Sequence, residues 1–200
     1  MKQYPSEDDD LKLAEKLVFA PIGLSLQKIP RGGGRTADLQ VLQNGALVAY
    51  CELKSPRDEW LDKLLDLAKP CQIVGGWRDD PVFNKIRKHA NKALQQFEAV
   101  NPTRAVPNIL VFVNHDDISD FGDLRETFTG LFHAADGSRH ATMPDMAASL
   151  NRAKSQIDLC VWIDVKTSKT QGYFFNQGAT PNYLNQLCAL LGVNPAAIQF

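Results

Sequence analysis

The segment from Ala37 to Lys54 constrains the fold of this chain more than any other. Two runs of strand-forming residues flank Asn44-Gly45, and Asn-Gly is the dipeptide that most strongly predicts a tight turn between antiparallel strands. The segment therefore predicts a β-hairpin. An acidic residue, Asp38, opens its first strand, and Glu52-Leu53-Lys54 closes the second.

The register of this hairpin decides whether its charged residues meet. With a two-residue turn, Asp38 lies opposite Cys51 and points away from Glu52, because side chains alternate between the faces of a sheet. A three-residue connection, 44–46, places Asp38 opposite Glu52, and we expect this bulged form because it separates polar from apolar residues. One face then carries Asp38, Gln40, Tyr50, Glu52 and Lys54, and the other carries Leu39, Val41, Leu47, Ala49, Cys51 and Leu53.

Composition limits the classes of protein to consider. A chain of 200 residues, 44% hydrophobic and 22% charged, is typical of a globular protein with a sizeable core. Its net charge of −1 argues against nucleic-acid binding through bulk charge. No apolar run reaches the roughly 20 residues that cross a bilayer, the first residues do not resemble a secretory signal, and the cysteines lack zinc-binding spacing. These features predict a cytoplasmic protein without membrane contact.

Ala37-Asp38 followed by Glu52-Leu53-Lys54 resembles the motif of the PD-(D/E)xK nuclease superfamily, with Ala37 where the family name has proline. The resemblance covers about residues 6–114. It implies an α/β, restriction-endonuclease-like fold, in which a mixed central β-sheet is flanked by helices. We expect residues 1–200 to form a single domain of this kind, with an elaborated C-terminal half over about 115–200.

The resemblance also implies roles for the hairpin residues. Asp38 and Glu52 would bind Mg²⁺ or Mn²⁺, with the Leu53 carbonyl as a third ligand, and Lys54 would orient or activate the attacking water. The chemistry agrees, since Mg²⁺ takes one or two carboxylates together with water and substrate phosphate. A bound cation polarises the phosphoryl group, and a partly desolvated lysine suits proton transfer near neutral pH.

An N-terminal helix offers one more acidic residue. Ser6 is a candidate N-cap, and the acids that follow it suit a first helical turn. Many members of the family supply an additional acid from the helix before the hairpin, and Glu15 is the best candidate for this metal ligand here. The alternative is that Glu15 is simply a solvated acid.

Two segments are candidates for contacts with phosphates. The first is Arg31-Gly-Gly-Gly-Arg35, where glycines allow close approach and arginines supply charge. The second is a helix predicted over 81–100, which places Lys85, Lys88, His89 and Lys92 on one face. Gln95 and Gln96 follow, and family members often place a glutamine or lysine from this helix near the metal. A flexible loop and a solvated basic face are the respective alternatives.

The remaining pattern predicts strands over 24–29, 108–114, 157–165 and 173–176. Helices are predicted over 121–134, 146–154 and 182–191, with a loop over 137–142. A rival site of Asp145 or Asp158 with Asp164-Val165-Lys166 is disfavoured, because Asp158 and Asp164, six residues apart on a strand, are about 20 Å apart.

These observations predict a Mg²⁺- or Mn²⁺-dependent nuclease that hydrolyses DNA phosphodiesters by attack of a metal-activated water. The alternative is a non-catalytic module of the same fold that binds nucleic acid or a protein. A homodimer or protein contact through the C-terminal half is a further expectation. No serine or cysteine nucleophile is grouped with a histidine and an acid in the sequence.

Overall fold

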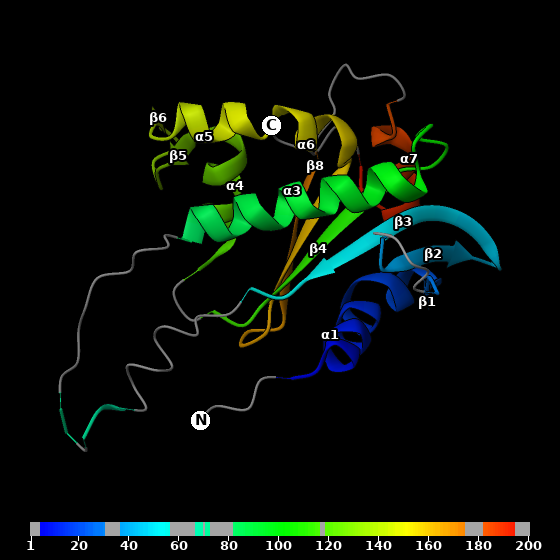
Figure 1. Ribbon diagram of the computed structural model, residues 1–200, viewed down its shortest axis with the longest axis horizontal. Helices are drawn as coiled ribbons and strands as arrows, with labels where there is room; N and C mark the ends of the chain where they lie inside the picture. The colour runs from blue at the N-terminus through cyan, green and yellow to red at the C-terminus, as the bar shows by residue number, and fades with distance from the viewer. Residues whose placement is uncertain are drawn as a thin grey trace.

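The computed structural model describes residues 5–30, 37–56, 67–69, 71–72, 82–116, 119–174 and 182–194. A six-stranded mixed sheet in the order β1-β2-β3-β4-β7-β8 forms its centre (Figure 1). Neighbouring strands are antiparallel except for the β3–β4 and β4–β7 pairs, which are parallel. The strands are β1 (Leu24–Lys28), β2 (Leu39–Gln43), β3 (Ala46–Lys54), β4 (Asn108–Asn114), β7 (Leu159–Asp164) and β8 (Lys169–Phe174). The expected α/β class with a mixed central sheet is confirmed.

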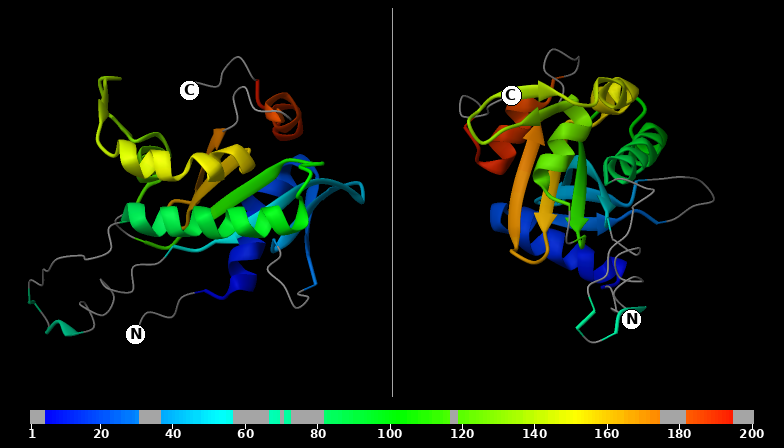
Figure 2. Two further views of the ribbon diagram at one scale, coloured as in Figure 1. Left: turned by 45° about the horizontal axis from the view of Figure 1, so that its top comes forward. Right: turned by 90° about the vertical axis from the view of Figure 1, so that its left-hand side faces the viewer.

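Helices cover both faces of the sheet (Figure 2). On one face lie α1 (Glu7–Ala14), the π-helical η1 (Glu15–Phe19), the short η2 (Ala20–Ile22) and α7 (Leu184–Leu191). On the other lie α3 (Val82–Val100), α4 (Phe121–Thr129), α5 (Pro144–Ser149) and α6 (Asn151–Gln156). None of the described helices is long and apolar enough to cross a membrane.

Strand alternation separates two apolar cores. Leu39, Cys51 and Val111 face α1 and α7, whereas Phe112 and Trp162 face α3 and its neighbours. All seven residues of β4 are buried, as expected for a continuous apolar run in the middle of a sheet. The face toward α3 is the one that carries Glu52 and Lys54, because these residues alternate with Cys51 and Leu53.

The N-terminal helix begins as its sequence predicts. Ser6 Oγ accepts the Asp9 N–H at 3.2 Å, and Asp9 Oδ2 accepts the Ser6 N–H at 3.0 Å, which is a capping box. Four acids in the first turn add a favourable interaction with the helix dipole. At Glu15 the α-helical pattern gives way to η1.

The C-terminal half differs from the sequence expectation in detail. The helix expected over 121–134 ends at Thr129, because Gly130 adopts a left-handed conformation (φ 71°) and caps it. Leu131–His133 then forms β5, which pairs with β6 (Arg139–Ala141) in a segment expected to be a loop. The helix expected over 146–154 is divided between α5 and α6, and β8 begins at Lys169, earlier than expected.

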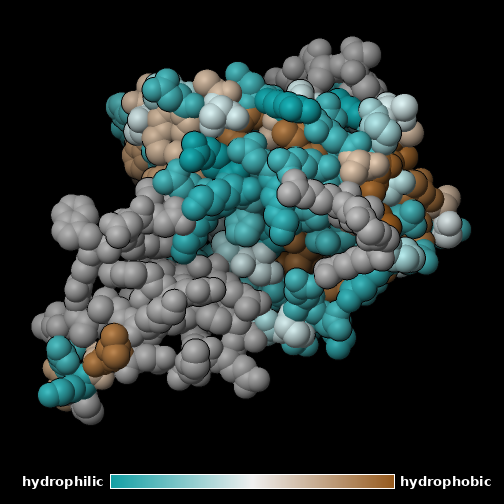
Figure 3. All heavy atoms as spheres, viewed as in Figure 1, coloured by the Kyte–Doolittle hydropathy of each residue, from teal (hydrophilic) through white to brown (hydrophobic). Residues whose placement is uncertain are grey.

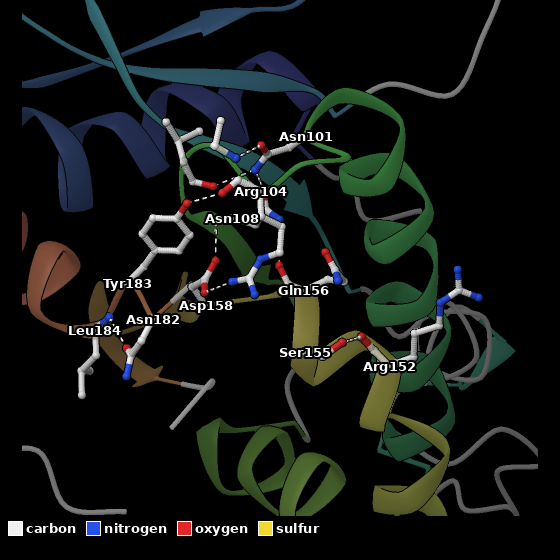
Figure 4. A network of polar contacts seen from close by, with 12 residues as sticks. Asn101, Arg104, Asn108, Arg152, Ser155, Gln156, Asp158, Asn182, Tyr183 and Leu184 are labelled. Carbon is white, nitrogen blue, oxygen red and sulfur yellow. Dashed lines mark hydrogen bonds and ion pairs between the residues drawn. The ribbon is translucent and has the colours of Figure 1, made fainter. Parts of the chain in front are cut away.

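A buried polar network joins the N-terminal ends of β4 and β7 (Figure 4). Asp158 forms an ion pair with Arg104 and accepts a hydrogen bond from the Asn108 N–H at 2.8 Å. The Tyr183 hydroxyl donates to the Arg104 carbonyl, and the Asn101 side chain donates to the Val106 carbonyl at 2.7 Å. Asp158 therefore fixes the architecture and takes no part in a rival metal site with Asp164.

Candidate active site

The β2–β3 hairpin brings Asp38 and Glu52 together, but by a different route from the one expected. The turn has two residues, Asn44 (φ 51°) and Gly45 (φ 81°), both in the left-handed region that a type I′ turn requires. Gln43 therefore pairs with Ala46, and the expected three-residue connection is wrong. The extra residue is a β-bulge in β3 at Val48, since Leu42 pairs with Leu47 and Val41 with Ala49.

Beyond the bulge the register is the expected one. Gln40 pairs with Tyr50 and Leu39 with Cys51, so that Asp38, directly before β2, reaches Glu52. The Asp38 N–H donates to Glu52 Oε2 at 2.9 Å. A bulge within the strand and a longer turn shift the register equally, and the sequence pattern does not distinguish between them.

Glu52 is the buried centre of the site, with a fully covered side chain. Its Oε1 forms an ion pair with Lys54 Nζ. Burial raises the pKa of Glu52 to about 7; the charge of Lys54 acts in the opposite direction, and the charge of Asp38 raises the pKa further. A carboxyl group with a pKa near 7 is protonated about half the time in neutral solution.

Lys54 is held from a second side by α3. Its Nζ donates to Gln96 Oε1 at 3.0 Å, and both side chains are buried. Of the two glutamines that the sequence leaves open, Gln96 thus lies at the candidate site, whereas Gln95 is exposed on α3. A lysine fixed between an acid and an amide has a defined position for its ammonium group.

The Leu53 carbonyl projects toward the side of β3 where Asp38 lies. The Tyr50 N–H donates to the Pro107 carbonyl just before β4, so the peptide groups of residue 50 and every second residue after it point to β4. Those of Leu53 point the other way, where β2 ends opposite Cys51. The Leu53 carbonyl therefore points to the end of the hairpin where Asp38 lies.

The donor set suits a hard cation that keeps most of its water. Among the described residues, no three His, Cys, Asp or Glu side chains are grouped so as to hold a metal ion. Asp38 and Glu52 provide two carboxylates, and the Leu53 carbonyl adds a neutral oxygen. Mg²⁺ binds through one or two carboxylates plus waters and substrate phosphate, so these residues fit it or Mn²⁺.

Glu15 does not join this group. Its Oε1 accepts the N–H of Leu26 at 3.3 Å, and β1 is an edge strand. The Ile29 N–H bonds to the Asp38 carbonyl, so by alternation the Leu26 N–H points away from β2, to the outside of the sheet. Glu15 satisfies this edge donor two strands from Glu52, and the sequence expectation of a metal ligand is corrected accordingly.

The basic face of α3 borders the site. Lys85, His89, Lys92 and Gln96 recur at helical spacing along the helix, and Lys88 is exposed next to them. Burial, followed by the charges of Lys54, Lys92 and Lys85, lowers the pKa of His89 to about 4. Hydrophilic side chains cover α3 on the face turned to the viewer (Figure 3). Arg31 and Arg35 lie outside the described residues.

A second polar cluster, which the sequence does not reveal, lies behind Lys54. Asp10 is buried; its Oδ2 accepts from Ser55 Oγ at 2.5 Å, and its Oδ1 lies 2.8 Å from His115 Nε2. The His115 N–H donates to the Pro56 carbonyl at 3.0 Å. The acid lies between the serine and the histidine, unlike a nucleophilic triad, where the histidine lies between the other two. The cluster thus anchors α1 to the ends of β3 and β4.

Sequence reasoning missed this cluster because Asp10, Ser55 and His115 are far apart in the chain. The available signal was slight: Asp10 is the one acid of the first turn that falls on the same side as Ala14. Comparison of the chain with protein-family models, with curated proteins and with solved structures gave no match.

Proposed function

We propose that this protein is a Mg²⁺- or Mn²⁺-dependent nuclease that hydrolyses DNA phosphodiester bonds. The observation that carries the proposal is the convergence of Asp38, Glu52 and Lys54 at the end of one hairpin, with Asp38 hydrogen-bonded to Glu52 and Glu52 paired with Lys54. The resemblance of these residues to the PD-(D/E)xK motif supports it. Restriction-endonuclease-like architecture is part of the same proposal.

Each residue has a separate role in this mechanism. Asp38, Glu52 and the Leu53 carbonyl hold the cation, which when bound polarises the phosphoryl group and lowers the pKa of water. Lys54 orients the attacking water and stabilises negative charge that develops on the phosphate. Gln96 holds the ammonium group of Lys54 in place. Lys85, Lys88, Lys92 and Gln95 on α3, with Arg31 and Arg35, contact the phosphates on either side.

The decisive experiment is cleavage of supercoiled plasmid and of an end-labelled single strand in Mg²⁺, Mn²⁺ or EDTA. We expect cutting by wild type in either metal and none in EDTA. Lys54→Ala and Asp38→Asn should each lose about a hundredfold or more, because each removes a group that acts on the transition state. Lys166→Ala, in the Asp-Val-Lys triplet at the end of β7, is the matched control and should cut at the wild-type rate.

One observation favours a non-catalytic alternative, a module that binds nucleic acid or protein. Both oxygens of Glu52 already accept hydrogen bonds, one from Lys54 and one from the Asp38 backbone. These contacts are also those expected of an ion pair that only stabilises the fold. Metal-independent binding of DNA by a wild type that cuts neither substrate would support this alternative and contradict the nuclease.

A further inference from the structure

Three polar side chains, from α4, β5 and β6, lie together in the C-terminal half, away from the candidate active site. Arg125 Nη2 donates to His133 Nδ1 at 2.8 Å. Arg139 pairs with His133 across the β5–β6 hairpin. Burial raises the pKa of Tyr173, and the charges of Arg125 and Arg139 lower it, so the phenol on β8 lies within electrostatic reach of both guanidinium groups.

The contact with Arg125 determines which nitrogen of His133 carries the proton. A guanidinium group only donates, so Nδ1 is the acceptor and the neutral ring has its hydrogen on Nε2. Burial, then Arg125 and Arg139, lower the pKa of His133, and Glu126 acts in the opposite direction to a smaller extent. His133 is therefore a neutral donor between two cations.

That donor has no acceptor. Nε2 of His133 is buried and without a hydrogen-bond partner. Leaving such a buried group without a hydrogen-bond partner destabilises the folded state. An oxyanion would accept the Nε2–H, bind the guanidinium groups through charge-assisted hydrogen bonds, and offset the repulsion between them.

We propose that Arg125, His133 and Arg139 form a binding site for inorganic phosphate or a phosphate monoester. Two arginines match the charge of a phosphate dianion, and its tetrahedral set of oxygens accepts guanidinium and imidazole donors together, whereas a carboxylate offers two oxygens. The site does not rest on the proposed nuclease activity, since β8 is three strands from β3 in the sheet.

Binding requires a local rearrangement, because Nε2 is covered by neighbouring atoms. The β5–β6 hairpin is suited to this, since Phe132, Arg139 and His140 are exposed on it. We therefore expect the hairpin to shift locally when the phosphate reaches the ring.

The first test is phosphate-dependent thermal stabilisation of the full chain, in sodium phosphate against sodium chloride at equal ionic strength. Wild type should show a saturable rise in Tm, because a ligand that binds only the native state stabilises it. Arg139→Gln should weaken phosphate binding about tenfold or more through loss of a charge-assisted contact. Arg152→Gln, at an exposed arginine on α6, makes the same change in net charge and should bind like wild type.

Two outcomes of that test overturn the proposal: equal stabilisation of Arg139→Gln and wild type, or an equal loss in Arg152→Gln. Nitrogen-15 NMR of the histidine rings provides a second, site-specific readout. The chain has four histidines, and His133→Gln identifies the resonance that belongs to His133. Inorganic phosphate should shift the Nε2 signal of His133; a signal that does not move at saturating phosphate contradicts the site.

The source of the phosphate is distinguished by a short oligothymidylate with and without a 5′-phosphate, added in EDTA. Competition with inorganic phosphate by the phosphorylated strand alone identifies a strand end as the ligand. If neither strand competes while inorganic phosphate still binds, the site takes a small free phosphate. Both results support the site and separate its two possible uses.

Discussion

Glu52 places an acidic group in an environment shielded from water. Its carboxyl is fully covered, bonded to the Asp38 backbone, and paired with Lys54. Burial therefore favours the protonated form, and the neighbouring ammonium group only partly compensates. A divalent cation that bound at such a site would displace a proton, so its binding would depend on pH.

This balance predicts how stability depends on pH in the metal-free protein. The pKa of Glu52 is raised from 4.5 to about 7, so between these values the native state keeps a proton that the unfolded state has lost. The stabilisation is fully present below pH 4.5 and is lost as the pH rises through 7. Between pH 5 and pH 8 the free energy of unfolding of wild type should therefore fall by about 2–3 kcal/mol more than that of Glu52→Gln, which has no titrating group at this position.

Urea unfolding in EDTA at the two pH values measures this difference. Glu98→Gln, on the half-exposed surface of α3, is the matched control and should follow the wild-type profile. If the free energy of unfolding depended on pH in the same way in Glu52→Gln and in wild type, the pKa of Glu52 would not be raised in the folded protein.

At the scale of elements, the turn and the bulge of the β2–β3 hairpin together set the site. Asn44-Gly45 predicted the hairpin correctly because positive φ at both positions is a local requirement that this dipeptide meets. The face sorting predicted the register correctly because it depends on alternation along the strand. The bulge at Val48 was not predicted, since a three-residue turn would shift the register by the same amount and sort the faces equally well.

The turn gives a direct test of this local requirement. A Cβ at Gly45 would contact nothing within 4 Å, so the cost of Gly45→Ala is the left-handed backbone alone, about 1–2 kcal/mol. Gly172 in β8 has ordinary strand geometry, and its Cβ would lie 3.5 Å from Leu159 Cδ1, so Gly172→Ala should be neutral or slightly stabilising. Denaturant unfolding of both variants compares them; equal losses would refute the type I′ turn.

For the molecule as a whole, the sequence predicted the positions of the helices and strands in the N-terminal half better than the long-range contacts between them. Short connections and periodic patterns are local, and they fixed α1, the hairpin, α3 and β4 closely. Glu15 was misplaced and the Asp10–His115 cluster was missed, because each depends on which distant strand a helix covers. Gly130 ends α4, but the sequence prediction extended this helix to residue 134 because apolar residues continue beyond the glycine.

A whole-molecule measurement tests whether the hairpin is a metal site. Mg²⁺ or Mn²⁺ should raise the Tm of wild type by mass action, and the rise should grow with cation concentration. Asp38→Asn should lose it, because one of two carboxylates is gone. Asp164→Asn, at the end of β7, should retain it; a cation-induced rise that is the same in Asp38→Asn as in wild type would place the metal elsewhere.

The central position of the buried strand β4 determines how the protein would behave if its chain were cut into two fragments. Its hydrogen-bonding partners are β3 from the first half and β7 from the second, and both edges of β4 are in use. Separation of the chain after Asn114 would leave each fragment with a bare, apolar strand edge, which is a template for aggregation. The same two edges pair with each other in the native sheet, so the two fragments are expected to associate through β4 and β7.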